Sequence, residues 1–182
     1  MPWQAPERRA AAVEIRAQGR RLAGYAALFD VEARIGDVRE TIAPGAFTRT
    51  LASGHDVLAL VDHDASRVLA RTRTGTLRLS QDTRGLAFDL DVPDTAPGRD
   101  VLALAERGDL GGMSFGFTVA PGGDRRDSGD TRELRAVTLH EISVVQGWPA
   151  YDGTTVAARA LDTKALRLNH ARRYLELASM GR

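Results

Sequence analysis

Residues 75–92 read GTLRLSQDTRGLAFDLDV and carry the clearest secondary-structure pattern of the chain. Leucines alternate with polar residues before the segment QDTRG, and apolar residues from Leu86 to Val92 alternate with small or acidic residues after it. A repeat of two residues puts apolar side chains on one face of a strand and polar ones on the other. The stretch therefore predicts an antiparallel hairpin with one buried and one wet face.

Other strands are predicted on both sides of this hairpin. They are short apolar runs bounded by polar or glycine-rich turns, which is typical of buried strands. The predicted strand regions are 13–28 (a hairpin turning at Gln18-Gly19-Arg20), 57–61, 113–119 and 136–145.

Two short helices and one loop complete the predicted core. A helix is expected to follow Pro44 and to end near Gly54, and another to run from Pro97 to Gly108, because proline opens helices and glycine ends them. The segment 121–130 is rich in glycine and charge, so a mobile loop is expected there.

The fold class that follows is α+β and mainly antiparallel β, with the strands forming a partly closed β-barrel with peripheral helices. Residues 1–12 are expected to be a flexible N-terminal arm, and residues 13–159 to form one domain. Residues 160–182 are expected to be a basic tail. In this tail, apolar residues recur every three to four positions from Leu161, which predicts an amphipathic C-terminal helix.

The composition limits the class of protein. The chain has 182 residues, a formal net charge of +1 and no cysteine. A balanced charge gives little attraction to nucleic acid or anionic membranes, and no apolar run approaches the roughly 18 residues of a membrane span. We therefore expect no nucleic-acid or membrane partner. Without cysteine, a site must use hydroxyl, imidazole, carboxylate or backbone groups.

Two side chains are candidates for nucleophilic chemistry. His63 ends a buried apolar run between Asp62 and Asp64, and imidazole is the side chain suited to general-base work near neutral pH. A structural histidine is an equally good reading of this position. Ser114 lies in GGMSFGF (111–117), where glycines let backbone approach a substrate closely. This pattern alone is weak, because the strand-turn-helix context of a nucleophile elbow is absent.

A third candidate is the carboxylate of Glu141. Regular alternation along 138–145 puts Glu141, together with Leu139 and Ser143, on one face of a central strand and His140 on the other. A carboxylate that faces inward needs a partner. His63 is one such partner, which Glu141 would orient toward Ser114. An ion pair with one of the arginines is the alternative.

Several short motifs together resemble a known family. In order, they are GYAALF (24–29), PGAF (44–47), DHD (62–64), GTLRL (75–79), DTRGL (82–86), PDT (93–95), GRD (98–100), MSFGF (113–117), LHEISVV (139–145) and PAY (149–151). Their order and spacing resemble those of the caudovirus prohead (capsid maturation) proteases, over about 24–159. That family is similar to the herpesvirus assemblins, whose antiparallel barrel is ringed by helices.

The resemblance implies a serine endopeptidase without a cofactor, so that residues 13–159 would be its protease domain. It maps the catalytic base onto His63 and the nucleophile onto Ser114. The third member maps onto Glu141, with His140 as the alternative, because this position is a histidine in the herpesvirus branch. The implied substrates are major capsid protein or scaffold protein, and the protease itself, inside the assembling procapsid in the host cytoplasm. Whether the chain forms a homodimer is left open, because the herpesvirus relatives require dimerisation.

Two rival functions and two readings of the tail remain at this stage. The chain could be a non-enzymatic assembly protein that binds capsid subunits or scaffold. It could instead be a metallohydrolase that uses His55, Asp62, His63 and His140, although no HExxH-like spacing occurs and no metal is expected. The C-terminal helix is either packed on the domain or, as we favour, docks on scaffold or capsid protein.

Overall fold

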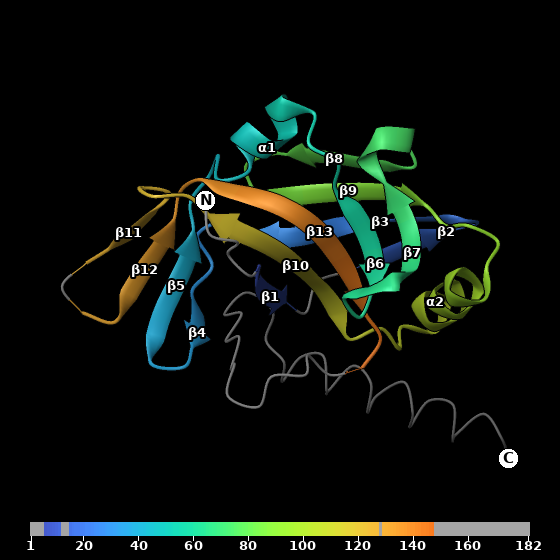
Figure 1. Cartoon of the computed structure of the whole chain (residues 1–182). Coiled ribbons are helices and arrows are strands. Elements are labelled where there is room, and N and C mark those ends of the chain that lie inside the picture. Colours follow the sequence, from blue (N-terminus) through green and yellow to red (C-terminus); the bar gives the residue numbers. More distant parts are fainter. Residues whose placement is uncertain (1–5, 12–14, 128, 148–182) are drawn as a thin grey trace, which may run out of the picture.

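The structure is a computed structural model and describes residues 6–11, 15–127 and 129–147. These residues form three β-sheets and two α-helices (Figure 1). The expectation of an α+β fold dominated by antiparallel strands is therefore confirmed. The described strands are divided among three sheets, so the partly closed barrel is not confirmed.

The largest sheet contains the three segments that carry the candidate residues. Its strand order is β1-β10-β13-β6-β7, and β13 and β6 are the one parallel pair in it. This order brings together, from distant parts of the chain, the two strands that flank His63, the strand with Ser114 and the strand with Glu141. The bounds are β1 Glu7–Ala11, β10 Gly112–Val119, β13 Val137–Val145, β6 Leu58–Val61 and β7 Asp64–Arg71.

Two four-stranded sheets complete the fold. One has the order β2-β3-β9-β8 and is antiparallel throughout, and the other has the order β11-β12-β5-β4 with β12 and β5 parallel. The bounds are β2 Ile15–Gln18, β3 Arg21–Leu28, β4 Ala33–Ile35, β5 Val38–Ile42, β8 Leu77–Gln81, β9 Gly85–Asp91, β11 Asp124–Arg126 and β12 Thr131–Leu134.

The predicted hairpin at 75–92 is confirmed by β8 and β9. Its turn is held by Oδ1 of Asp82, which accepts hydrogen bonds from the backbone N–H groups of Arg84 and Gly85. Gly85 also allows a close approach to β3, since a Cβ at this position would lie 2.0 Å from the carbonyl oxygen of Ala27. The glycine therefore joins the hairpin to β3 as well as ending its turn.

The two predicted helices are also confirmed. Helix α2 spans Ala96–Arg107, begins at Thr95, whose Oγ1 accepts from the N–H of Gly98, and ends at Gly108 with a φ of 74°. Helix α1 spans Thr48–Ser53 and ends at Gly54 in the same left-handed conformation. Glycine takes positive φ without steric cost, which explains why both helices stop there. A short 3-10 turn, η1, spans Thr72–Thr74.

Two segments differ from the sequence-based expectation. The flexible arm expected over 1–12 contains the strand β1, and the mobile loop expected over 121–130 contains the short strand β11. Neither segment was predicted as a strand, because neither has an alternating pattern. Their strand structure comes from backbone pairing with β10 and β12 and from ion pairs. The predicted C-terminal helix from Leu161 lies outside the described residues.

A row of aromatic rings forms the core behind β10. Phe47 lies 6.1 Å from Phe29 and 5.7 Å from Phe115 between ring centroids, and Phe115 lies 5.2 Å from Phe117. All four rings are buried. Such pairs add to the free energy gained from burying apolar area, so β10 has a rigid support on this face. The opposite face of β10 carries Ser114.

Candidate active site

His63 lies in the two-residue turn between β6 and β7. Both Asp62 and His63 have positive φ, 50° and 61°, which is the conformation of a type I′ hairpin turn. This conformation is uncommon for residues other than glycine and persists where the surroundings hold it. Here Asp62 anchors the turn, since its carboxylate accepts from the N–H of Gln146 at 2.9 Å and from Arg67 at 3.1 Å.

The imidazole of His63 is bonded to Glu141 on β13. Nδ1 of His63 lies 2.6 Å from Oε1 of Glu141, and both side chains are largely buried. A carboxylate only accepts hydrogen bonds, so Nδ1 carries the hydrogen and Nε2 of the neutral ring keeps its lone pair. The pair thus leaves a nitrogen available as a proton acceptor.

Ser143 links the histidine to the carboxylate a second time. Its Oγ accepts from the backbone N–H of His63 at 3.1 Å and donates to Oε2 of Glu141 at 2.6 Å. The hydroxyl therefore positions both the turn and the carboxylate. The alternation of the strand predicts Ser143 on the face of Glu141, and its position two residues further along was the signal for this role, which the sequence alone did not assign.

Ser114 lies on β10 directly opposite Ser143. Gly116 lies opposite Glu141 in the same register, so Ser114, Gly116, Glu141 and Ser143 share one face of the sheet. The structure therefore gathers Ser114 and the His63–Glu141 pair on one surface. Ser114 is 1% exposed, and its hydroxyl donates its hydrogen bond to the carbonyl oxygen of Arg9, at 2.8 Å, rather than to His63.

Gly116 makes room for the carboxylate. A Cβ built at this glycine would lie 2.4 Å from Oε1 of Glu141, well inside van der Waals contact. Any larger residue would push the carboxylate away from its present position over β10. The glycines around Ser114 were expected to let substrate backbone approach, whereas one of them, Gly116, accommodates the carboxylate of Glu141.

A β-bulge at His140 interrupts the regular alternation of β13. Regular alternation predicted Leu139 on the face of Glu141, and this is wrong because the register shifts between Gly116 and Phe117. Leu139 pairs with Phe117 and is buried with it, whereas His140 is the extra residue of the bulge and is skipped in the register with β10.

His140 instead makes its own contacts. Its Nε2 lies 2.9 Å from Oγ1 of Thr118, and its ring centroid lies 5.5 Å from that of His55. Burial, and then the nearby His55, lower the pKa of His140. Of the two candidates for a third member, Glu141 is thus the one bonded to His63.

The described part of the chain contains no cluster of three or more His, Asp or Glu side chains arranged to hold a metal ion. His55 and His140 lie together, while His63 is bonded to Glu141, so the four proposed ligands of the metallohydrolase alternative do not form one such cluster. Among the described helices, neither has the length and apolar character required to cross a membrane.

Comparison with known proteins identifies the family of the chain. A family model described as caudovirus prohead serine protease matches residues 8–168, which is most of the chain. No curated protein and no solved structure matches the chain significantly. The matched range contains β10, β13 and the turn at His63, and with them every residue of the hydrogen-bonded arrangement above. The chain therefore belongs to the caudovirus prohead serine proteases, a family of serine peptidases that act in capsid maturation.

Proposed function

We propose that the chain is a serine endopeptidase in which Ser114 is the nucleophile, His63 the general base and Glu141 the residue that orients the base. One observation carries the proposal, namely the 2.6 Å contact between His63 and Glu141 on the face of the sheet that also bears Ser114. The family of the chain supports the coarser part of the proposal, that the chain is a serine peptidase. An acid, a base and a hydroxyl on one surface are the components of nucleophilic acyl transfer.

The chemistry follows from the hydrogen bonds. Oγ of Ser114 attacks the scissile carbonyl carbon while Nε2 of His63 takes the hydroxyl proton. The same proton then passes to the nitrogen of the leaving amine, and water hydrolyses the resulting ester by the reverse steps. Glu141 holds the tautomer with hydrogen on Nδ1 and offsets the charge of the imidazolium, and Ser143 holds the carboxylate.

For this chemistry His63 and Ser114 must meet. The hydroxyl now points to the carbonyl of Arg9, and a single rotation about its side-chain bond is the smallest change that redirects it. Its neighbour in register, Ser143, contacts both His63 and Glu141, so Ser114 lies one strand spacing from a residue that is bonded to both.

The substrates we propose are scaffold protein or the scaffold-like segment of the major capsid protein, together with the protease itself. Cleavage would take place inside the assembling procapsid in the host cell. The family supports the capsid-maturation setting. The basic C-terminal segment from Leu161 is proposed to dock on scaffold or capsid protein and so bring the protease into the shell.

The test is co-expression of the full chain with its capsid and scaffold proteins, in wild-type form and as Ser114→Ala. Mass spectrometry should find cleaved scaffold or capsid protein and protease fragments with the wild type, and uncleaved chains in arrested procapsids with Ser114→Ala. Ser80→Ala is the matched control, because Ser80 is exposed on β8, and should behave as wild type. Normal maturation with Ser114→Ala would favour the alternative, a non-enzymatic assembly protein.

A further inference from the structure

Strand β1 covers the proposed nucleophile. It is an edge strand of its sheet, paired with β10 in the register Ala10 to Ser114 and Arg8 to Gly116. Ser114 is buried beneath it and donates to the carbonyl oxygen of Arg9. In this arrangement no external peptide can reach the hydroxyl. The strand must therefore leave this edge, in whole or in part, before a second chain is cleaved.

The backbone of β1 occupies the place that a peptide bound to the edge of β10 would take. Peptides commonly bind by adding a strand to an exposed sheet edge, where backbone hydrogen bonds give affinity and side-chain pockets give specificity. If β1 were removed, β10 would be such an edge, with Ser114 on it. The carbonyl group of Arg9 is the backbone group that the hydroxyl of Ser114 contacts. The residue at the place of Arg9 thus supplies the carbonyl nearest to the nucleophile.

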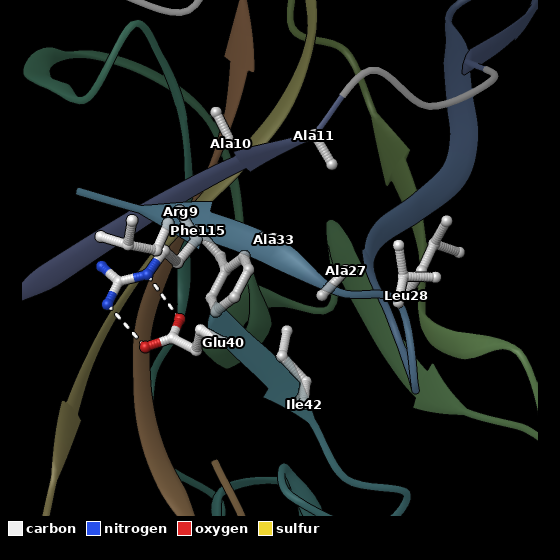
Figure 2. A pocket seen from close by; sticks show the side chains of 11 residues that line it. Arg9, Ala10, Ala11, Ala27, Leu28, Ala33, Glu40, Ile42 and Phe115 are labelled. Atoms are coloured by element: carbon white, nitrogen blue, oxygen red, sulfur yellow. Dashed lines mark hydrogen bonds and ion pairs between the residues drawn. The ribbon is translucent and has the colours of Figure 1, made fainter. Parts of the chain in front are cut away.

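The side chain of Arg9 is seated in an acidic site on the other face of the sheet. Nε and Nη2 of Arg9 lie 2.6 and 2.9 Å from the two carboxylate oxygens of Glu40, a bidentate pair (Figure 2). Its guanidinium group also lies 5.3 Å from the ring centroid of Phe117. Glu40 is 3% exposed, and this fork-shaped pairing with a planar ring alongside fits an arginine side chain.

An apolar pocket lies next to the position of Ala11. Figure 2 shows Ala10 and Ala11 pointing in opposite directions, as expected for a strand, and the pocket lies beside them. Nine of its eleven lining residues are apolar, among them Ala11, Ala27, Ile42 and Phe115, and the other two are Arg9 and Glu40. Because alanine is small, it leaves this space unfilled. A larger apolar side chain at the same place would occupy it.

We propose that the edge of β10 now covered by β1 is the substrate-binding edge, and that Glu40 selects an arginine or lysine side chain at the place of Arg9. This inference rests on the proposed function. The substrate pairs antiparallel with β10, and Oγ of Ser114 bonds to the carbonyl carbon of its basic residue. The bond from that carbon to the next nitrogen breaks, and the nitrogen receives the serine proton through His63. Water then releases the carboxylate. An apolar residue two positions after the basic one fills the pocket at Ala11.

The test uses the full chain and peptides based on residues 6–12, PERRAAA, added in trans. One set replaces the second arginine by lysine, glutamine or glutamate, and another replaces the alanine at the place of Ala11 by leucine. The wild type should cleave after arginine or lysine with kcat/KM at least about tenfold above glutamine, the scale of a charge-assisted hydrogen bond. Leucine at the second place should raise kcat/KM further. Equal cleavage of the arginine and glutamine peptides would overturn the proposal.

Two variants of the chain assign the preference to the site. Glu40→Gln should abolish the difference between arginine and glutamine peptides while cleavage persists, and a retained preference would overturn the role of Glu40. Arg9→Ala removes the chain's own arginine side chain from Glu40 and should lower KM for the arginine peptide several-fold. This measurement tests the site even if Glu40→Gln fails to fold. An unchanged KM would contradict competition by β1. Arg39→Ala, an exposed cation on the same strand as Glu40, is the matched control and should match wild type.

Binding to the Ser114→Ala chain separates this inference from the proposed function. Fluorescence anisotropy with labelled peptides should show tighter binding of the arginine peptide than of the glutamine peptide, and this difference should vanish when Glu40→Gln is added. If no peptide is cleaved by the wild type but this difference is found, the protease function fails and the peptide-binding edge stands. If the Ser114→Ala chain binds both peptides equally, the peptide-binding edge fails.

Discussion

Nδ1 of His63 and Oε1 of Glu141 lie 2.6 Å apart, although 78 residues separate them in the chain. The parallel pairing of β6 with β13 brings them together, because the turn after β6 returns the histidine over the face that carries the carboxylate. The bond leaves the second imidazole nitrogen free to accept a proton. Four predictions test what this relationship and its surroundings do.

Replacing Glu141 by glutamine should reduce kcat by about 10³- to 10⁴-fold, the scale seen when the orienting carboxylate of a catalytic triad becomes an amide. The amide can donate to Nδ1, so the hydrogen moves to the nitrogen that must act as base. The measurement is kcat on a cleaved peptide. Glu133→Gln, on β12 away from His63, is the control and should retain wild-type kcat. A Glu141→Gln chain with wild-type kcat would exclude Glu141 from the mechanism.

Gly116→Ala should lower activity without unfolding the domain. The added Cβ would meet Oε1 of Glu141 at 2.4 Å, so the flexible carboxylate must move away from His63. A displacement of about 1 Å in a catalytic group costs on the order of 100-fold in rate. Gly147→Ala is the control, since nothing lies within 4 Å of a Cβ there. Peptide turnover beside a thermal melt measures both effects, and undiminished turnover would show that the carboxylate position is unimportant.

Ser143→Ala should affect both stability and rate. The backbone N–H of His63 and Oε2 of Glu141 would each lose a buried partner, which costs about 1–3 kcal/mol of unfolding free energy. The rate should fall by about tenfold, less than for Glu141→Gln, because the direct bond between His63 and Glu141 remains. Urea unfolding and kcat are the measurements. A variant that loses stability but keeps its kcat would restrict Ser143 to a structural role.

His140 should make stability depend on pH. Burial and the neighbouring His55 lower the pKa of His140 in the folded chain below its ordinary value near 6.5. As pH falls below about 6.5, the unfolded chain takes up this proton before the folded chain does, so the free energy of unfolding decreases. Urea unfolding at pH 7.5 and 5.5 should show this loss. His140→Gln should reduce the loss, and an unchanged pH dependence in the variant would contradict the assignment.

Local sequence patterns predicted much of the secondary structure. The alternation in 75–92 predicted β8 and β9, and the Pro97 and Gly108 signals predicted α2, because these patterns reflect side-chain and backbone preferences within one segment. The apolar pattern of 136–145 likewise predicted β13. His63 was one of the two kinds of partner expected for Glu141, the other being an arginine. The contact of Glu141 with His63 agrees with the first of these expectations.

Local sequence patterns could not predict the contacts between distant segments. The bulge at His140 depends on how β13 pairs with β10, and it separates Leu139 from the face on which alternation placed it. The strand β1 has the sequence ERRAA, which alternates neither in polarity nor in size. Its order comes from β10 alongside it and from the carboxylate of Glu40 on another sheet, neither of which is adjacent in the sequence.

The sequence by itself therefore determined the class of fold, most strand and helix positions, and the three candidate side chains His63, Ser114 and Glu141. Only the tertiary structure decided that Glu141 rather than His140 is bonded to His63, that Ser143 and Gly116 position this pair, and that β1 covers Ser114. The physical reason is that a strand's propensity is local, whereas register and burial arise from pairing between strands that are far apart in the chain.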